Sequence, residues 1–264
     1  MSAITAMLRR DLLIWLSYRT AVLAQVGSIF TILVLIYFVS HFMGSDPSRF
    51  GGQAADYFSF LLAGYVFGEV FSQTFLGFQE SLRESQVNGT LEPLLLSRIR
   101  ISTLILGSSV FRVALTLVRC TVYVGVAVVV FGYWHHANVP GVLLVLIVAS
   151  VPCALYGVLA AAFVLKIKRG EPAVAAFIGA NWILGGVLFP TTLLPTWVQP
   201  LAMALPFTEG LAGVRQALQG ASLGTLVMPL MVLAGTCLVV GPLALMGFRL
   251  ALRQAKLEGS LVQY

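Results

Sequence analysis

The chain has 264 residues, of which 59% are hydrophobic and only 10% are charged, and its mean hydropathy is +0.94. A soluble domain of this size needs far more polar surface around its core, so the composition excludes a soluble protein and indicates a membrane protein. The formal net charge of +6 does not call for nucleic acid as a partner, because the positions of the charges account for it.

Long apolar runs set the expected architecture. A membrane-spanning helix needs about 20 apolar residues, and six such runs follow one another along the chain, at 20–43, 58–82, 104–133, 140–165, 172–190 and 226–248. We therefore predict an all-α polytopic membrane protein with six transmembrane helices, forming a single transmembrane domain over residues 1–264.

Residues 1–19 precede the first run and are amphipathic. Apolar residues recur at helical spacing up to Trp15, and Arg9, Arg10 and Asp11 interrupt them. This pattern is typical of a helix that lies on the membrane surface. We predict an interfacial helix on the cytoplasmic leaflet, and the alternative is a frayed tail.

The basic residues of the loops predict the orientation, because Lys and Arg beside membrane helices favour the cytoplasmic side. With the N-terminus inside, the outer loops hold only Arg49 and Arg215, and residues 249–264 form a cytoplasmic tail. The cytoplasmic side then holds twelve basic residues, namely Arg9, Arg10, Arg19, Arg83, Arg98, Arg100, Lys166, Lys168, Arg169, Arg249, Arg253 and Lys256. Both termini are therefore expected in the cytoplasm.

Residues 83–100, between the second and third runs, carry the signals of a short helix. Asn88-Gly89 predicts a turn. Thr90 is a good N-cap, and the carboxylate of Glu92 suits the positive end of a helix. Pro93 is tolerated in a first turn, and the apolar residues from Leu91 to Ile99 form a stripe. On physical grounds this helix is equally an ordinary connector or a docking element for a soluble partner.

Residues 190–223 are apolar but broken by Pro190, Pro195, Pro200 and Pro206. Proline interrupts a helix, so one clean span is not expected here. We predict two short helices that dip into the outer leaflet as part of an outer gate, capped by Thr196 and Thr208. The alternative is a seventh, kinked span.

Three charged residues fall inside predicted spans and away from their ends. Glu69 lies in the second, and Arg112 and Arg119 lie in the third. The two arginines share a helix face, because they are seven residues apart. We predict an ion pair between Glu69 and one of them, or a row of arginines along the pathway. The alternative is that both arginines extend to the lipid headgroups.

No pattern for catalysis or metal binding is found. The cysteines, Cys120, Cys153 and Cys237, lie in apolar runs and are expected to be packing residues. Three histidines, His41, His135 and His136, are placed at outer helix ends without further ligands. The chain also lacks the G-x-x-x-x-G-K-[ST] motif that holds ATP. It is therefore not expected to be an enzyme.

Residues 89–97, Gly-Thr-Leu-Glu-Pro-Leu-Leu-Leu-Ser, resemble the G-T-x-E-x-L-x-x-[ST] stretch of ABC-2-type permeases, the membrane subunits of ABC exporters. Leu194-Pro195-x-Trp197 and Leu205-Pro206-x-Thr208, followed by Glu209 and Arg215, are similar to the family's region between spans five and six. The tail from Phe248 to Leu261 is similar to the family's C-terminal ending.

The resemblance implies a coupling helix that contacts a separate ATPase subunit through Gly89, Thr90, Leu91, Glu92, Pro93, Leu94, Leu95 and Leu96. The outer gate predicted from the proline-broken segment comprises Pro190, Leu194, Pro195, Trp197, Pro206, Phe207, Glu209 and Arg215. ATP and Mg would bind the partner ATPase, and two permease copies, as a homodimer or with a homologous permease, would form the pathway.

The expected setting is the bacterial inner membrane, and the expected cargo is a hydrophobic or amphipathic compound: a drug, a lipid or a lipid-linked glycan. The alternative function is an ion-coupled secondary transporter or channel. Such a protein would have to use Glu69, Arg112 and Arg119, the charged residues that lie away from the ends of the predicted spans.

Overall fold

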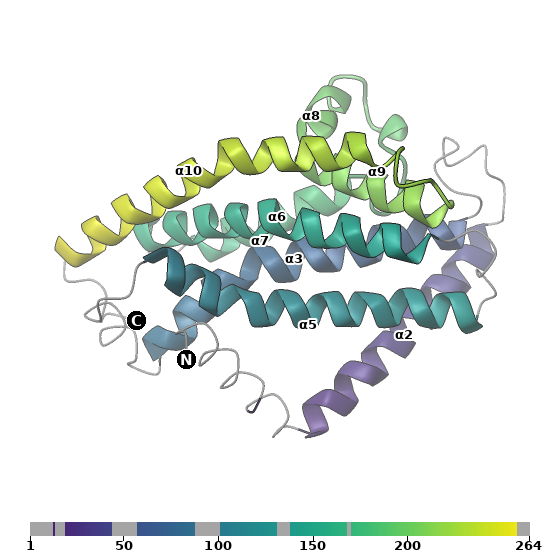
Figure 1. Cartoon of the computed structure of the whole chain (residues 1–264), viewed down its shortest axis with the longest axis horizontal. Helices are drawn as coiled ribbons and strands as arrows, with labels where there is room; N and C mark the ends of the chain where they lie inside the picture. The colour runs from purple at the N-terminus through teal and green to yellow at the C-terminus, as the bar shows by residue number, and fades with distance from the viewer. Residues whose placement is uncertain are drawn as a thin grey trace.

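The computed structural model describes residues 13, 19–43, 57–87, 101–130, 138–167 and 170–257. All secondary structure in these residues is helical, and the helices lie side by side in a bundle (Figure 1). In chain order they are α2 (Arg19–Met43), α3 (Tyr57–Val87), α5 (Ile101–Val130), α6 (Val139–Ile167), α7 (Glu171–Leu184), the 3₁₀ turn η3 (Thr191–Leu193), α8 (Gln199–Ala204), α9 (Pro206–Leu218) and α10 (Val227–Leu257).

Five of these helices, α2, α3, α5, α6 and α10, are long and apolar enough to cross a membrane. The predicted class of an all-α polytopic membrane protein is therefore confirmed. The fifth apolar run forms α7, which has only 14 residues. At 1.5 Å per residue it rises about 21 Å, less than the hydrocarbon thickness of about 30 Å. The total of six spans therefore stays a prediction.

The helix formed by the fifth apolar run ends before the run does, because two glycines follow α7. Gly185 donates its backbone N–H to Asn181 O at 2.9 Å, which closes the helix. Gly186 adopts φ +80°, a left-handed conformation that glycine reaches without steric cost. The chain turns there, and residues 185–190 continue without helix instead of completing a span.

Two other helices extend beyond the ends that the sequence predicts. α3 continues to Val87, so residues 83–87 of the predicted coupling region extend a span. α10 continues to Leu257, so much of the predicted cytoplasmic tail is helical. Residues 88–100, and all of residues 1–19 apart from Leu13 and the start of α2, lie outside the described part of the chain. The coupling helix and the interfacial helix therefore stay predictions.

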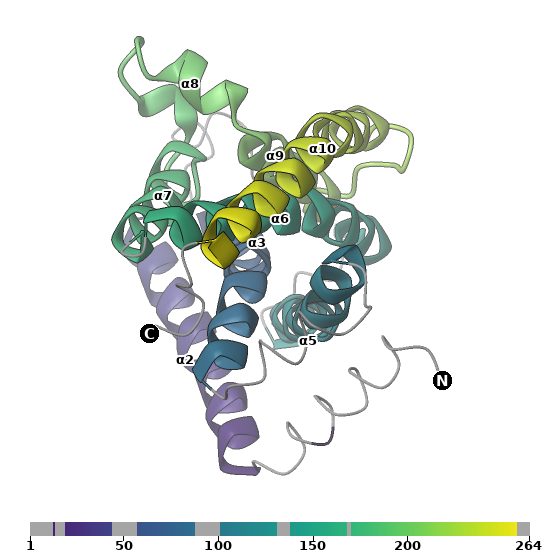
Figure 2. The ribbon, with the colours of Figure 1, turned by 90° about the vertical axis from the view of Figure 1, so that its left-hand side faces the viewer.

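α3 is the central helix of the bundle. In an 18-residue apolar stretch of its span Tyr57–Ser81, 78% of the residues are buried, whereas the share is 17% in the corresponding stretches of α2 and α10. α3 packs against α5, α6 and α9, while α10 lies along α6 (Figures 1 and 2). Hydrophobic side chains such as Phe30, Val129 and Leu238 face outward from the outer helices, as expected for lipid contact.

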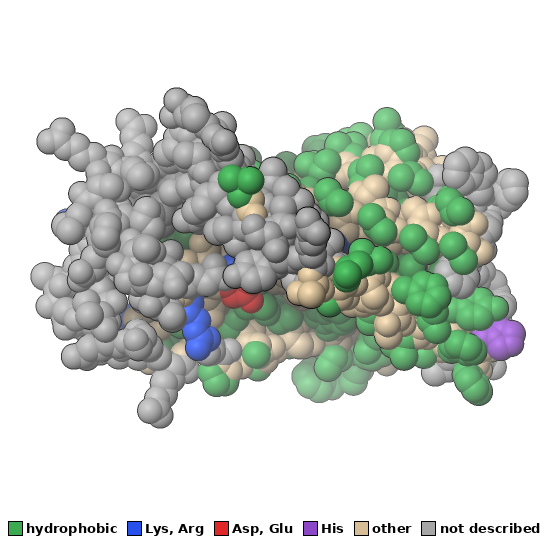
Figure 3. All heavy atoms as spheres, turned by 90° about the horizontal axis from the view of Figure 1, so that it is seen from below, with side chains coloured by type: hydrophobic (Ala, Val, Ile, Leu, Met, Phe, Trp, Pro, Cys, Tyr) green, Lys and Arg blue, Asp and Glu red, His purple; other side chains and the backbone are tan. Residues whose placement is uncertain are grey.

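Figure 3 views the bundle from the side of α2 and α5, and hydrophobic side chains cover most of the described surface there. The Lys, Arg, Asp and Glu side chains that are visible gather toward one end of the view, and a histidine lies at the opposite end. This face is therefore suited to hydrocarbon over much of its length.

Glycines allow the neighbours of α3 to approach its backbone closely. A Cβ at Gly64 would collide with the carbonyl of Val187, and one at Gly68 would lie 2.8 Å from the Trp182 ring. On α6, a Cβ at Gly157 would collide with the carbonyl of Phe75. Small residues at helix contacts are the usual means by which membrane helices pack tightly.

Adding one methyl group at the α3–α6 contact tests this packing. We expect Gly157→Ala to lower the free energy of unfolding by about 1–3 kcal/mol, because α6 must move away from α3. The measurement is unfolding of the purified protein by denaturing detergent, followed by circular dichroism.

Gly235→Ala on α10 is the matched control, because nothing lies within 4 Å of the added Cβ there. It should not destabilise the protein, since alanine is the better helix former. Equal destabilisation by both changes would contradict the close contact at Gly157.

Candidate functional site

An ion pair joins α3 and α5 within their membrane-spanning segments. Arg119 Nη1 lies 3.1 Å from Glu69 Oε1, and the two side chains are 20% and 11% exposed. The sequence left two arginines as partners for Glu69, and the structure brings only Arg119 to it. A charged side chain at the centre of a membrane helix costs about 2.5–3.5 kcal/mol, so this pairing offsets a large penalty.

Arg112 lies two helical turns from Arg119 and contacts a different carboxylate. Its Nη1 lies 2.5 Å from Glu80 Oε2, and the side chains are 29% and 48% exposed. Glu80 was not among the predicted site residues. The sequence spacing could have indicated it. Residues eleven apart on a helix share a face, as Glu69 and Glu80 do, and so do residues seven apart, as Arg112 and Arg119 do. Glu69 and Glu80 therefore match Arg119 and Arg112 across two antiparallel helices.

Further polar contacts extend the charged cluster along α3. Gln73 Nε2 is 3.5 Å from Glu69 Oε1, which it contacts as a weak donor. One turn in the other direction, the hydroxyl groups of Tyr65 and Tyr123 are 3.3 Å apart. Tyr65, Glu69 and Gln73 thus form one polar stripe on α3 that faces α5. The Nε atom of Arg119 is buried without a hydrogen-bond partner, so the cluster retains one unused donor.

The residues predicted as an outer gate do not form one cluster in the structure. The residues of this set differ in exposure to solvent. Pro195 and Trp197 are exposed, Leu194 and Glu209 are half-buried, and Pro190, Phe207 and Arg215 are buried. Pro206 begins α9. The exposed group accompanies α8, which projects from the side of the bundle in both views (Figures 1 and 2).

Arg215, predicted as an outer-loop residue, is buried on α9. Its Nη2 donates a hydrogen bond of 2.6 Å to the carbonyl of Gly186, and its guanidinium carbon lies 3.7 Å from the centre of the Phe60 ring. One side chain therefore links α9, the turn after α7 and α3. Arg215 holds the helices of this region together through these contacts.

The predicted helix caps of this region are wrong. The N-cap of α8 is Val198 and that of α9 is Leu205, and neither makes a side-chain cap. Thr208 instead donates its hydroxyl to Ala202 O at 2.5 Å. Each helix has a proline in its first turn, where a missing backbone N–H costs no hydrogen bond. These prolines, and not a capping side chain, set where the two helices begin.

The predicted coupling residues, Gly89 to Leu96, lie outside the described residues. The described chain fixes only their attachment points. α3 ends and α5 begins at the same end of the bundle, where α6 and α10 also end (Figure 1).

Comparison with known proteins identifies the family. The sequence model of the ABC-2 type transporter family matches residues 2–218, from the N-terminal region to the end of α9. The chain therefore belongs to the ABC-2 type transporter family, and it is a multi-pass transmembrane component of an ABC-type transporter. The match does not include α10, so the similarity of the C-terminal tail stays a prediction. No curated protein matches the chain.

A double-mutant cycle tests the ion pair between α3 and α5. Glu69→Gln and Arg119→Gln should each lower the free energy of unfolding by about 3 kcal/mol, because each leaves a charge without its partner in the membrane. The loss of unfolding free energy in the double variant should be smaller than the sum of the two single losses by at least about 1 kcal/mol. Unfolding by denaturing detergent measures all three.

The same cycle with Glu80→Gln and Arg112→Gln is the matched control. This pair is more exposed, so we expect a coupling of about 0–1 kcal/mol. Additive losses at Glu69 and Arg119 would show that the two side chains do not interact.

Arg215→Lys tests the contacts of α9. Lysine keeps the charge but loses the planar group that lies over Phe60 and bonds Gly186, so we expect a loss of stability of about 1–2 kcal/mol. Arg253→Lys, at an exposed position of α10, should change stability by less than about 0.5 kcal/mol. Thermal unfolding in detergent compares the two, and an unchanged Arg215→Lys protein would argue against this role.

Proposed function

We propose that the chain is the permease subunit of an ATP-driven exporter that works as a dimer of two identical copies. The observation that carries this proposal is the family match over residues 2–218, which covers α2 to α9. The sequence has no ATP-binding motif of its own. Energy therefore comes from a separate ATPase subunit, which holds ATP and Mg.

The link to the ATPase is residues 88–100. They join α3 to α5 at the end of the bundle where α6 and α10 also finish (Figure 1). Lys166 lies in the last turn of α6, and Arg253 lies near the end of α10, so both are at this end of the bundle. Basic residues favour the cytoplasmic side, which supports a cytoplasmic position for this end and for both termini. The ATPase docks there against the segment from Gly89 to Leu96, in a bacterial inner membrane.

The cargo is a hydrophobic or amphipathic compound, such as a drug, a lipid or a lipid-linked glycan. Support comes from the apolar surface of the bundle, on which large side chains such as Phe30, Phe42 and Trp197 are exposed. A compound of this kind reaches the protein from the bilayer and does not need a soluble receptor domain. The paired charges between α3 and α5 keep these two helices in register during transport.

Co-purification tests the coupling proposal directly. The tagged chain is expressed in its native membrane, solubilised gently and isolated, and bound nucleotide-binding chains are detected by photolabelling with azido-ATP. We expect one labelled ATPase with the wild type and at least a tenfold loss with Glu92→Arg or Leu95→Asp, because these changes alter the charge and the apolar stripe of the docking segment.

Arg253→Glu is the control, since it reverses a charge on α10 outside the docking segment. It should retain the ATPase. Size-exclusion chromatography establishes that each variant is folded. If no ATPase accompanies the wild type, the proposal fails, and the Glu69–Arg119 pair becomes the starting point for an ion-coupled carrier.

A further inference from the structure

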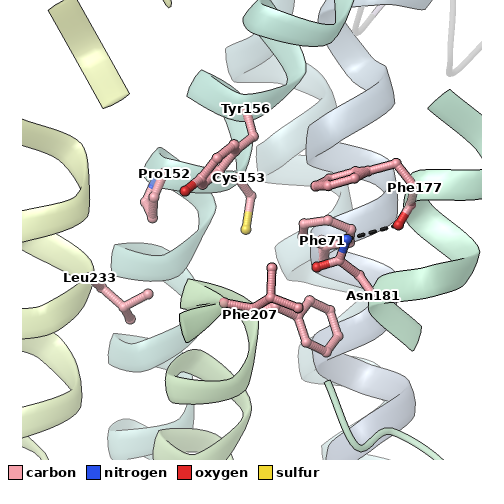
Figure 4. Close-up of a pocket in the computed structure, with 9 residues that line it drawn as sticks. Phe71, Pro152, Cys153, Tyr156, Phe177, Asn181, Phe207 and Leu233 are labelled. Atoms are coloured by element: carbon pink, nitrogen blue, oxygen red, sulfur yellow. Dashed lines mark hydrogen bonds between the residues drawn. The ribbon is translucent and has the colours of Figure 1, made fainter. Parts of the chain in front are cut away.

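A cavity of about 160 Å³ lies inside the bundle, between α6, α7 and α9, with further walls from α3 and α10 (Figure 4). Its walls are almost entirely apolar and include three phenylalanines, Phe71, Phe177 and Phe207. A more open pocket of about 320 Å³ shares Tyr156 and Phe177 with the first, so the two adjoin. Together they reach the size range of small-molecule sites in proteins.

Packed aromatic rings hold the walls of the cavity in place. Phe71 meets Phe207 edge to face with ring centres 4.9 Å apart, and Phe177 stacks on Phe75 at 5.5 Å. α7 is also fixed to α3 by Trp182, whose Nε1 donates to Ser72 Oγ at 3.0 Å. The space therefore exists before any ligand enters, and a ligand need not pay for opening it.

One polar group is directed into this apolar space. Asn181 on α7 is 3% exposed, and its Nδ2 donates to the carbonyl of Phe177 at 2.8 Å. Its carbonyl oxygen points toward the middle of the cavity (Figure 4). No group among the described residues donates a hydrogen bond to this oxygen. This oxygen borders the pocket, so a ligand that enters can supply the donor that it lacks.

The depth of the cavity restricts the ligand. Cys153 and Tyr156 lie near the middle of α6, and Phe71 lies near the middle of the span Tyr57–Ser81. A lipid offers only hydrocarbon at this depth, and hydrocarbon has no hydrogen-bond donor. Lipid tails therefore fill the space without satisfying Asn181. The aromatic walls favour a ring, which makes edge-to-face contacts with phenylalanine.

We propose that this cavity binds a small aromatic compound with a single NH or OH group, which donates to Asn181 Oδ1. As a statement about cargo, this inference rests on the proposed export function and narrows the cargo to aromatic amphiphiles. As a statement about binding, it concerns a single chain and needs neither ATP nor a second subunit.

Binding is measured on the purified full chain in lipid nanodiscs with N-phenyl-1-naphthylamine, an aromatic amine whose fluorescence rises in apolar sites. We expect saturable binding above that of empty nanodiscs. Cys153→Phe should weaken it at least tenfold, because Cys153 lines the cavity and its sulfur points inward (Figure 4). Val151→Phe adds the same ring on α6 at a position that is 52% exposed, and should leave binding unchanged.

The hydrogen bond is tested with Asn181→Leu and with the N-methyl derivative of the probe, which has no NH. We expect Asn181→Leu to weaken binding of the NH probe about three- to tenfold, the range for one hydrogen bond. The N-methyl probe should bind the wild type and Asn181→Leu equally well. Equal sensitivity of both probes, or equal weakening by Val151→Phe and Cys153→Phe, overturns the proposal.

A measurement on the wild type avoids any folding defect of the variants. The NH probe should bind the wild type about three- to tenfold more tightly than the N-methyl probe, because only the NH probe can donate to Asn181 Oδ1. Equal affinity of the two probes for the wild type overturns the proposal. These assays contain no ATPase, so their failure leaves ATPase coupling intact, and a failed ATPase co-purification leaves the binding result intact.

Discussion

The close contact of α3 with its neighbours is the constraint on which the rest of the bundle depends. Where Gly64 and Gly157 bring backbone against backbone, a single added Cβ would collide with a carbonyl. Lipid tails are as apolar as the side chains, so tight packing replaces the hydrophobic effect as the force between these helices. The same contact fixes which face of α3 remains for α5, and that face carries Tyr65, Glu69 and Gln73.

The polar contacts of the bundle follow from this geometry. Because α3 is fixed by α6, Glu69 faces α5 and finds Arg119 at 3.1 Å. On another side of the bundle, Arg215 links α9 to the turn at Gly186. A buried charge in a membrane needs a partner at a definite position, so these contacts add specificity to packing that is largely non-directional. The cavity beside α7 is lined by an acceptor but by no charged side chain among the described residues.

How much the sequence predicts depends on the kind of information needed. The apolar runs locate the spans well, because hydrocarbon demands the same composition over every long helix. They fail at α7, where Gly185 and Gly186 end the helix before the run ends. The caps of α8 and α9 fail because Pro200 and Pro206 decide the helix starts. The partner of Arg112 and the cavity depend on which helix faces meet, and one sequence does not contain that information.

The short length of α7 has a consequence for the surrounding lipid. Its rise of about 21 Å is about 9 Å less than the hydrocarbon core of an average bilayer. A bilayer crossed at α7 must therefore thin locally, since hydrophobic mismatch is relieved by lipid deformation next to a short helix. A fifth span made of α7 alone would leave the neighbouring lipids less ordered than those around the long helices, and the membrane would be easier to disturb at that position.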